Sequence, residues 1–121
     1  MEQLIAHLLG DYVLQNHWMA NKKTQEWLPA LVHVFLYSLP FLLLTQSPLA
    51  MAVIVGTHLI IDRYRLAAYW VDFWGTGKKG WVGEKLGVEL EDSPAWLGVW
   101  LLFIVDNTMH LCINYAALRW L

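Results

Sequence analysis

Charged residues are scarce in this sequence, and it contains a single cysteine. Asp, Glu, Lys and Arg make up 15% of the 121 residues, against about 25% in typical soluble proteins. Cys112 has no second cysteine with which to form an internal disulfide, so cysteine usage says nothing about the redox compartment. The net charge of −2 is too small to favour a polyanionic partner, and we expect no nucleic-acid binding. The hydrophobic content of 58% favours a membrane protein instead.

A long central run lacks formal charge altogether, from Trp27 to Ile61. A bilayer core about 30 Å thick is crossed by about 20 helical residues, so this run is too long for one span and about sufficient for two. The polar residues of 45–48, ending in Pro48, provide a turn between the two spans. We therefore predict helices over 28–45 and 48–66, with a kink at Pro40.

Two further segments complete the predicted bundle. The segment 94–119 begins after a suitable N-cap, Ser93, and Asp106 is its only formal charge before Leu118. The segment 2–19 is more polar, and it lacks the basic leader and cleavage site of a signal peptide. We predict an all-α fold with one transmembrane domain over 1–121. The domain would be a polytopic bundle of about four helices with an interfacial cytoplasmic loop over about 67–92.

The basic residues predict how such a bundle is oriented. If all four helices span, seven of the eight Lys and Arg residues lie on one side and only Arg119 lies on the other. Basic residues concentrate on the cytoplasmic side of membrane proteins. We therefore expect a bacterial inner-membrane protein with both termini outside the cytoplasm and membrane lipid as its partner. The seven residues are Lys22, Lys23, Arg63, Arg65, Lys78, Lys79 and Lys85.

Histidine and aspartate recur four residues apart in three of the predicted helices. Chance gives about 0.4 such pairs in a chain of this composition, and residues at this spacing share one helix face. Ionisable groups inside a bilayer are costly and usually mark function. The predicted site residues are the three pairs and one further histidine: His7 and Asp11, His58 and Asp62, Asp106 and His110, and His33.

Imidazole and carboxylate groups together bind Zn, Mn or non-haem Fe. Seven candidate ligands are more than one tetrahedral ion uses, and they suit two ions about 3.5–4 Å apart. We therefore expect one or two divalent metal ions. Gln15 and Asn114 continue two of the ligand faces and could support the ligands. In a second interpretation, each histidine simply hydrogen-bonds the aspartate of its own helix. Haem is a weaker candidate because it has no use for the aspartates.

The motifs also resemble a known family. The stretches "LIAHLLGDYVLQNHWMANKK", "LVHVFLYSLPF", "THLIIDRYRLA" and "PAWLGVWLLFIVDNTMHLCINY" are similar to a family of small bacterial and phage membrane proteins, catalogued as a domain of unknown function. The pattern more loosely resembles bacterial membrane-bound metal-dependent hydrolases. That looser resemblance implies metal-ligand roles for the seven residues above and supplies no substrate.

Two classes of function follow. The first is a membrane-bound metal-dependent hydrolase acting on a lipid or lipid-linked substrate, with Asp11, Asp62 or Asp106 as general base. The alternative is a small non-enzymatic membrane protein, accessory or phage-encoded, in which the His/Asp cluster is a structural metal clasp or an ion path. A pore-forming phage lysis protein is a third interpretation, although a pore has no need for repeated His/Asp pairs.

Overall fold

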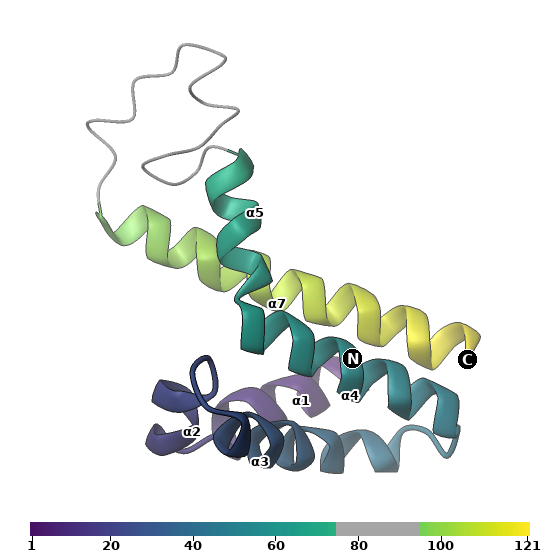
Figure 1. The fold of residues 1–121 in the computed structure, drawn as a ribbon. Coiled ribbons are helices and arrows are strands. Elements are labelled where there is room, and N and C mark those ends of the chain that lie inside the picture. Colours follow the sequence, from purple (N-terminus) through teal and green to yellow (C-terminus); the bar gives the residue numbers. More distant parts are fainter. Residues whose placement is uncertain (75–94) are drawn as a thin grey trace. The chain divides into compact units, whose positions relative to one another are not determined.

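The structure, a computed structural model, describes residues 1–74 and 95–121, and all its regular elements in these ranges are helices. The prediction of an all-α fold is therefore confirmed. The chain divides into two compact units, residues 1–64 with 110–121 and residues 65–109. The first of these, called the main unit below, contains every element up to α4 and the end of α7 (Figure 1).

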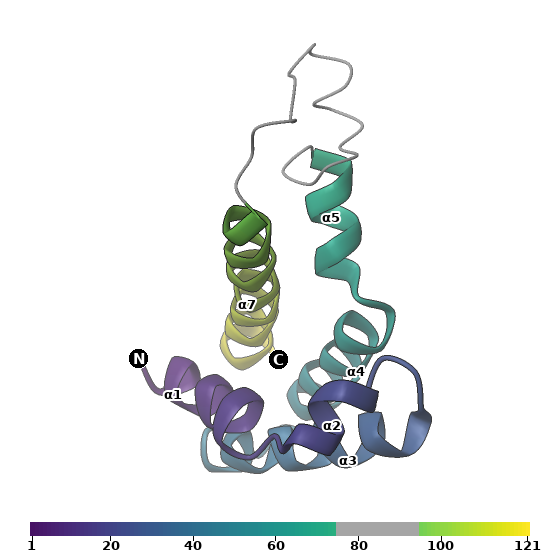
Figure 2. The same ribbon diagram turned by 90° about the vertical axis from the view of Figure 1, so that its left-hand side faces the viewer.

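The N-terminal segment is not the single helix predicted over 2–19. Helix α1, Glu2–Leu8, continues into the π-helical turn η1, Leu9–Val13, and the chain then breaks before α2, His17–Lys22 (Figure 2). Asn16 causes the new start, because its side chain accepts a hydrogen bond from the Met19 amide, as N-cap residues do. The π-helical turn is a feature often found at functional sites.

The central apolar run forms two helical segments, as predicted. Helix α3, Trp27–Ser38, gives way to the 3-10 helix η2, Leu39–Leu43, where Pro40 lacks the N–H that an α-helix requires. Helix α4 then covers Pro48–Tyr64. It ends two residues earlier than predicted, and the next residue, Arg65, has a positive φ of 53°, outside the helical region.

The predicted four spans are not confirmed as such. Among residues 1–74 and 95–121, only Trp96–Trp120 is long and apolar enough to cross a membrane by itself. It lies within α7, Ala95–Trp120, close to the predicted helix 94–119. The start of the predicted loop is helix α5, Leu66–Trp74, and the rest of that loop lies outside the described residues.

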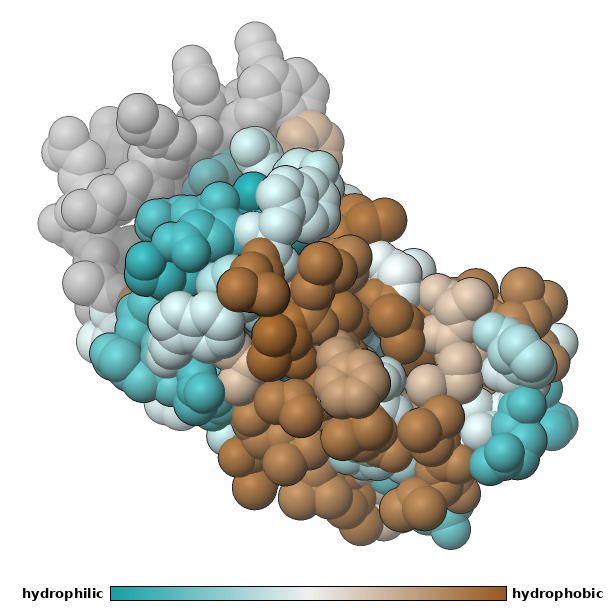
Figure 3. All heavy atoms as spheres, turned by 60° about the horizontal axis from the view of Figure 1, so that its bottom comes forward, coloured by the Kyte–Doolittle hydropathy of each residue, from teal (hydrophilic) through white to brown (hydrophobic). Residues whose placement is uncertain are grey.

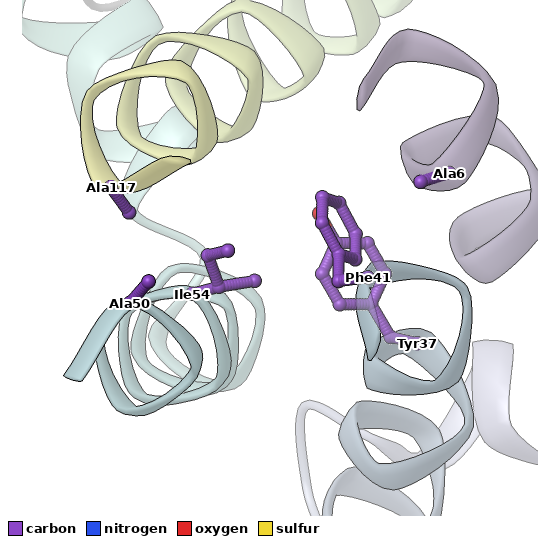
Figure 4. Close-up of a cluster of buried hydrophobic side chains, with 6 residues drawn as sticks. All are labelled: Ala6, Tyr37, Phe41, Ala50, Ile54 and Ala117. Carbon is purple, nitrogen blue, oxygen red and sulfur yellow. The ribbon is translucent and has the colours of Figure 1, made fainter. Parts of the chain in front are cut away.

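The main unit has an unusual distribution of polar and apolar residues. Its apolar core is a small cluster (Figure 4), whereas four of its five histidines are buried. Large apolar side chains instead lie exposed along α3 and η2, and Figure 3 shows a broad hydrophobic face on that side. The core cluster consists of Ala6, Tyr37, Phe41, Ala50, Ile54 and Ala117. The exposed apolar residues of α3 and η2 include Trp27, Leu28, Leu31, Phe35, Leu39, Leu42 and Leu43.

Candidate metal centre

Four of the seven predicted ligands meet at one buried point of the main unit. Asp11 comes from η1, His33 from α3, and His58 and Asp62 from consecutive turns of α4. Each of the four offers one ligand atom, and these atoms lie within 4.8 Å of one another. The four-residue spacing on α4 aligns its two ligands on one face, as the sequence predicted, while the other two arrive from separate segments.

The distances between the ligand atoms match those around a tetrahedral ion. Asp11 Oδ1 lies 3.2 Å from His33 Nε2 and 3.6 Å from His58 Nε2. Asp62 Oδ2 lies 3.2 Å and 3.4 Å from the same two nitrogens, which are 3.0 Å apart. A tetrahedral ion with bonds of about 2.0–2.1 Å separates its ligands by about 3.3–3.4 Å. The four atoms therefore fit the coordination shell of one small divalent cation.

One carboxylate oxygen of this cluster lacks a hydrogen bond. Asp11 Oδ1 is buried, and no described group donates a well-directed hydrogen bond to it, although His33 Nε2 is only 3.2 Å away. Buried polar atoms almost always have a partner, and an unpaired buried carboxylate oxygen is costly. A cation at the centre of the cluster would provide that partner.

Lys23, at the end of α2, is a member of the cluster that the sequence did not identify. Its ammonium lies 2.5 Å from Asp62 Oδ2, 3.3 Å from His33 Nε2 and 3.9 Å from Asp11 Oδ1. The sequence interpretation assigned Lys23 to a cytoplasmic connection because it stands in a basic pair near a predicted helix end. Only the break at residues 14–16, which starts a new helix, turns this lysine toward the aspartates.

His110, on the part of α7 that belongs to the main unit, contacts two members of the cluster. Its Nε2 lies 3.1 Å from Asp62 Oδ1, and its Nδ1 lies 3.1 Å from His58 Nδ1. It thus contacts the carboxylate oxygen of Asp62 that is not among the four ligand atoms. His110 is in this geometry a neighbour of the ligands.

His7 occupies a similar position beside the other carboxylate. Its Nε2 lies 3.7 Å from Asp11 Oδ2, and its Nδ1 lies 2.9 Å from the Tyr37 hydroxyl. Asn114 donates a hydrogen bond of 2.7 Å to the same hydroxyl, so it supports the site as predicted, though through Tyr37. Tyr37 was not predicted, and its ring stacks on His58 with the centroids 3.5 Å apart.

Asp106 and Gln15 were also predicted to take part in the site, and neither is among the four residues of the centre described above. Asp106 precedes His110 by one turn of α7 and belongs to the unit of residues 65–109, so the centre described above does not include it. The Gln15 Oε1 atom is buried and has no hydrogen-bond partner among the described residues. His17 is exposed at the start of α2.

The interpretation in which each histidine pairs with its own aspartate is incomplete. His33 has no aspartate four residues away, yet it lies 3.2 Å from an oxygen of both Asp11 and Asp62. His110 likewise lies 3.1 Å from a carboxylate oxygen on another helix, that of Asp62 on α4. These three contacts between segments, at 3.1–3.2 Å, are shorter than the within-helix contacts of His58 with Asp62, 3.4 Å, and of His7 with Asp11, 3.7 Å.

One family matches almost the whole chain, including every residue of this centre. The family described as "Protein of unknown function (DUF3307)" matches residues 1–119. The chain belongs to the DUF3307 family. As a DUF3307 protein it carries no reaction over from its family, and the looser resemblance to metal-dependent hydrolases stays a prediction. No curated protein and no solved structure matches the chain.

Proposed function

We propose that this DUF3307 protein is an integral membrane protein that binds a divalent metal ion and acts as a metal-dependent hydrolase at the membrane. The observation that carries the proposal is the four-atom cluster of Asp11, His33, His58 and Asp62, with separations that suit one ion. Two imidazole nitrogens and two carboxylate oxygens are ligands for Zn, Mn or Fe. Lipid or lipid-linked esters are the proposed substrates.

The distribution of side chains supports the membrane location. The buried positions of the main unit include His7, His33, His58 and Asn114, while leucine, phenylalanine and tryptophan side chains of α3 and η2 are exposed. Water-soluble proteins seldom leave so large an apolar surface uncovered. Lipid would cover this surface, and α7 is long and apolar enough to span.

The chain's own residues could support hydrolysis at this centre. When bound, a divalent ion lowers the pKa of a coordinated water and polarises the bond to be cut. A catalytic ion needs a position open to water or substrate. We assign this position to Asp62, because its oxygens already contact Lys23 and His110 and would stay paired if it left the ion. Asp62 is then the general base that takes a proton from water.

Lys23 favours an anionic substrate for the proposed reaction. Its side chain is 16% exposed, so the ammonium lies at the edge of the buried cluster. A cation beside a metal ion can hold the negative oxygens of a phosphoester. We therefore place lipid-linked phosphoesters ahead of neutral lipid esters.

Asp62→Asn tests the proposed hydrolase directly. The protein, purified in detergent and loaded with Zn or Mn, would be assayed against phospholipids and lipid-linked phosphates. We expect wild type to cleave one of them, Asp62→Asn to lose the activity while keeping its expression level, and the exposed-site control His17→Gln to match wild type. Equal activity in wild type and Asp62→Asn would contradict the proposed base.

A structural metal clasp is the second candidate, and one observation favours it. The four ligands come from three separate segments and fill a tetrahedral shell, and closed shells are typical of structural sites. If the centre is a clasp, Asp62→Asn should abolish folding, whereas a catalytic centre should lose activity with the fold intact.

A further inference from the structure

We infer that the centre holds one ion and that His110 positions the ligand His58 and the proposed base Asp62 without binding a metal itself. This inference rests on the metal binding proposed above and decides between one and two ions. Its basis is the chain of hydrogen bonds that links the three side chains.

The first link fixes the proton between two imidazoles. The Nδ1 atoms of His58 and His110 lie 3.1 Å apart, and one of them must donate a proton to the other. If His58 binds the ion through its Nε2 lone pair, its neutral ring carries the proton on Nδ1. His58 is then the donor, and His110 Nδ1 is the acceptor.

The second link follows from the first. With Nδ1 as acceptor, the neutral His110 ring carries its proton on Nε2. That atom lies 3.1 Å from Asp62 Oδ1. A carboxylate oxygen needs an N–H donor to form a hydrogen bond, and the protonated Nε2 provides it. His110 Nε2 therefore has no lone pair to offer a second ion while His58 ligates the first. Outer hydrogen bonds of this kind fix the tautomer and orientation of ligands.

His7 shows the same arrangement beside Asp11. Asn114 donates to the Tyr37 hydroxyl, which lies 2.9 Å from His7 Nδ1. If the hydroxyl donates its own proton to that nitrogen, His7 Nδ1 is the acceptor. His7 Nε2 then carries a proton, and it faces Asp11 Oδ2 at 3.7 Å. His7 and His110 thus both direct N–H groups at carboxylate oxygens that are not among the four ligand atoms, Asp11 Oδ2 and Asp62 Oδ1. A second ion between them would meet protons in place of lone pairs.

Metal stoichiometry and ligand counting test the inference. The full-length protein in detergent would be loaded with excess Zn, freed of unbound ion and analysed for metal per chain, and its Zn would be examined by X-ray absorption. We expect one ion per chain in wild type, bound by two imidazoles. His110→Gln, which keeps an N–H for Asp62, should bind one ion with two imidazoles and an affinity about 10–100-fold lower. His110→Ala should bind still more weakly, and His17→Gln should match wild type.

Several results would overturn the inference. His110 would be a ligand if wild type bound two ions or if its Zn had more than two imidazole ligands. It would also be a ligand if His110→Gln lost one of two bound ions. Unchanged affinity in both His110 variants would show that it does not position the ligands. If the variants fail to fold, the wild-type ion and imidazole counts decide alone. A wild type without any metal would instead contradict the proposed function itself.

Discussion

The Nε2 atoms of His33 and His58 lie 3.0 Å apart, each within 3.6 Å of oxygens from both Asp11 and Asp62. In a chain without a metal ion at this point, the two nitrogens would face each other with room for only one proton between them, and Asp11 Oδ1 would stay without a well-directed hydrogen bond. A metal ion resolves both features, because it accepts lone pairs from all four atoms. The geometry of this pair therefore underlies the predictions that follow.

Replacing Lys23 should separate ion binding from substrate binding. Its ammonium lies 2.5 Å from Asp62 Oδ2 and would compete with a metal ion for that oxygen. We expect Lys23→Met to raise metal affinity by about tenfold, or about 1.4 kcal/mol, and to lower activity toward phosphoesters. Competition with a fluorescent chelator measures the affinity. Lys22→Met is the control, since Lys22 is half-exposed and pairs with Glu26; equal affinities in the two variants would show that Lys23 does not compete.

Gly10 permits the close approach of η1 to α3. A Cβ at this position would lie 2.6 Å from Tyr37 Cδ2 and 3.0 Å from Tyr37 backbone atoms. Overpacking of this kind costs about 1–3 kcal/mol, and it would displace the neighbouring Asp11. We expect Gly10→Ala to lower both the free energy of unfolding in detergent and the metal affinity. Gly56→Ala, where a Cβ meets nothing within 4 Å, should match wild type or be more stable by up to about 1 kcal/mol.

Tyr37 should support the site without binding the ion. Tyr37→Phe removes one hydrogen bond from His7 and one from Asn114, both of which are buried. The loss should destabilise the fold by about 1–3 kcal/mol while the number of bound ions stays the same. Chemical denaturation and metal analysis on the same sample measure the two quantities. If the Tyr37→Phe protein bound no metal, this result would indicate that the Tyr37 hydroxyl is itself a ligand.

Chelation should weaken the folded state. An ion that binds only the folded protein stabilises it by about 2.7 kcal/mol when its concentration is 100 times the dissociation constant. We expect the Tm of the metal-loaded protein to fall after treatment with a strong chelator and to recover when Zn is restored. His58→Ala should show no such response, because it lacks one of the four ligands. A chelator response of equal size in His58→Ala would place the stabilising ion elsewhere.

Much of the candidate site could be predicted from the sequence because its key spacing is local. The His58–Asp62 pair lies on one helix, and four-residue spacing aligns such side chains whatever the rest of the chain does. Asp11 was predicted as a ligand from its four-residue spacing with His7, and His33 was predicted as the further histidine of the remaining helix. Their convergence with α4 depends on how separate helices pack, which spacing along the chain does not specify.

Other features depended on local events that the hydrophobic pattern does not show. The π-helical turn at Leu9–Val13 and the helix start at Asn16 divide the predicted helix 2–19. That division brings Lys23 to the carboxylates. The apolar content predicted four spans. The lengths of the helices, however, depend on Pro40 and Arg65, where the α-helical backbone is interrupted. Sequence spacing likewise could not distinguish the histidines of the four-atom cluster, His33 and His58, from the histidines beside it, His7 and His110.

Metal analysis of wild type beside His58→Ala tests the central claim most directly. Both proteins would be purified in detergent at matched concentration, loaded with Zn and measured by elemental analysis after removal of free ion. We predict about one ion per chain in wild type and, with a ligand removed, an affinity lower by more than about 100-fold in His58→Ala. A wild type that retains no metal, or a His58→Ala protein that retains as much as wild type, would contradict the account.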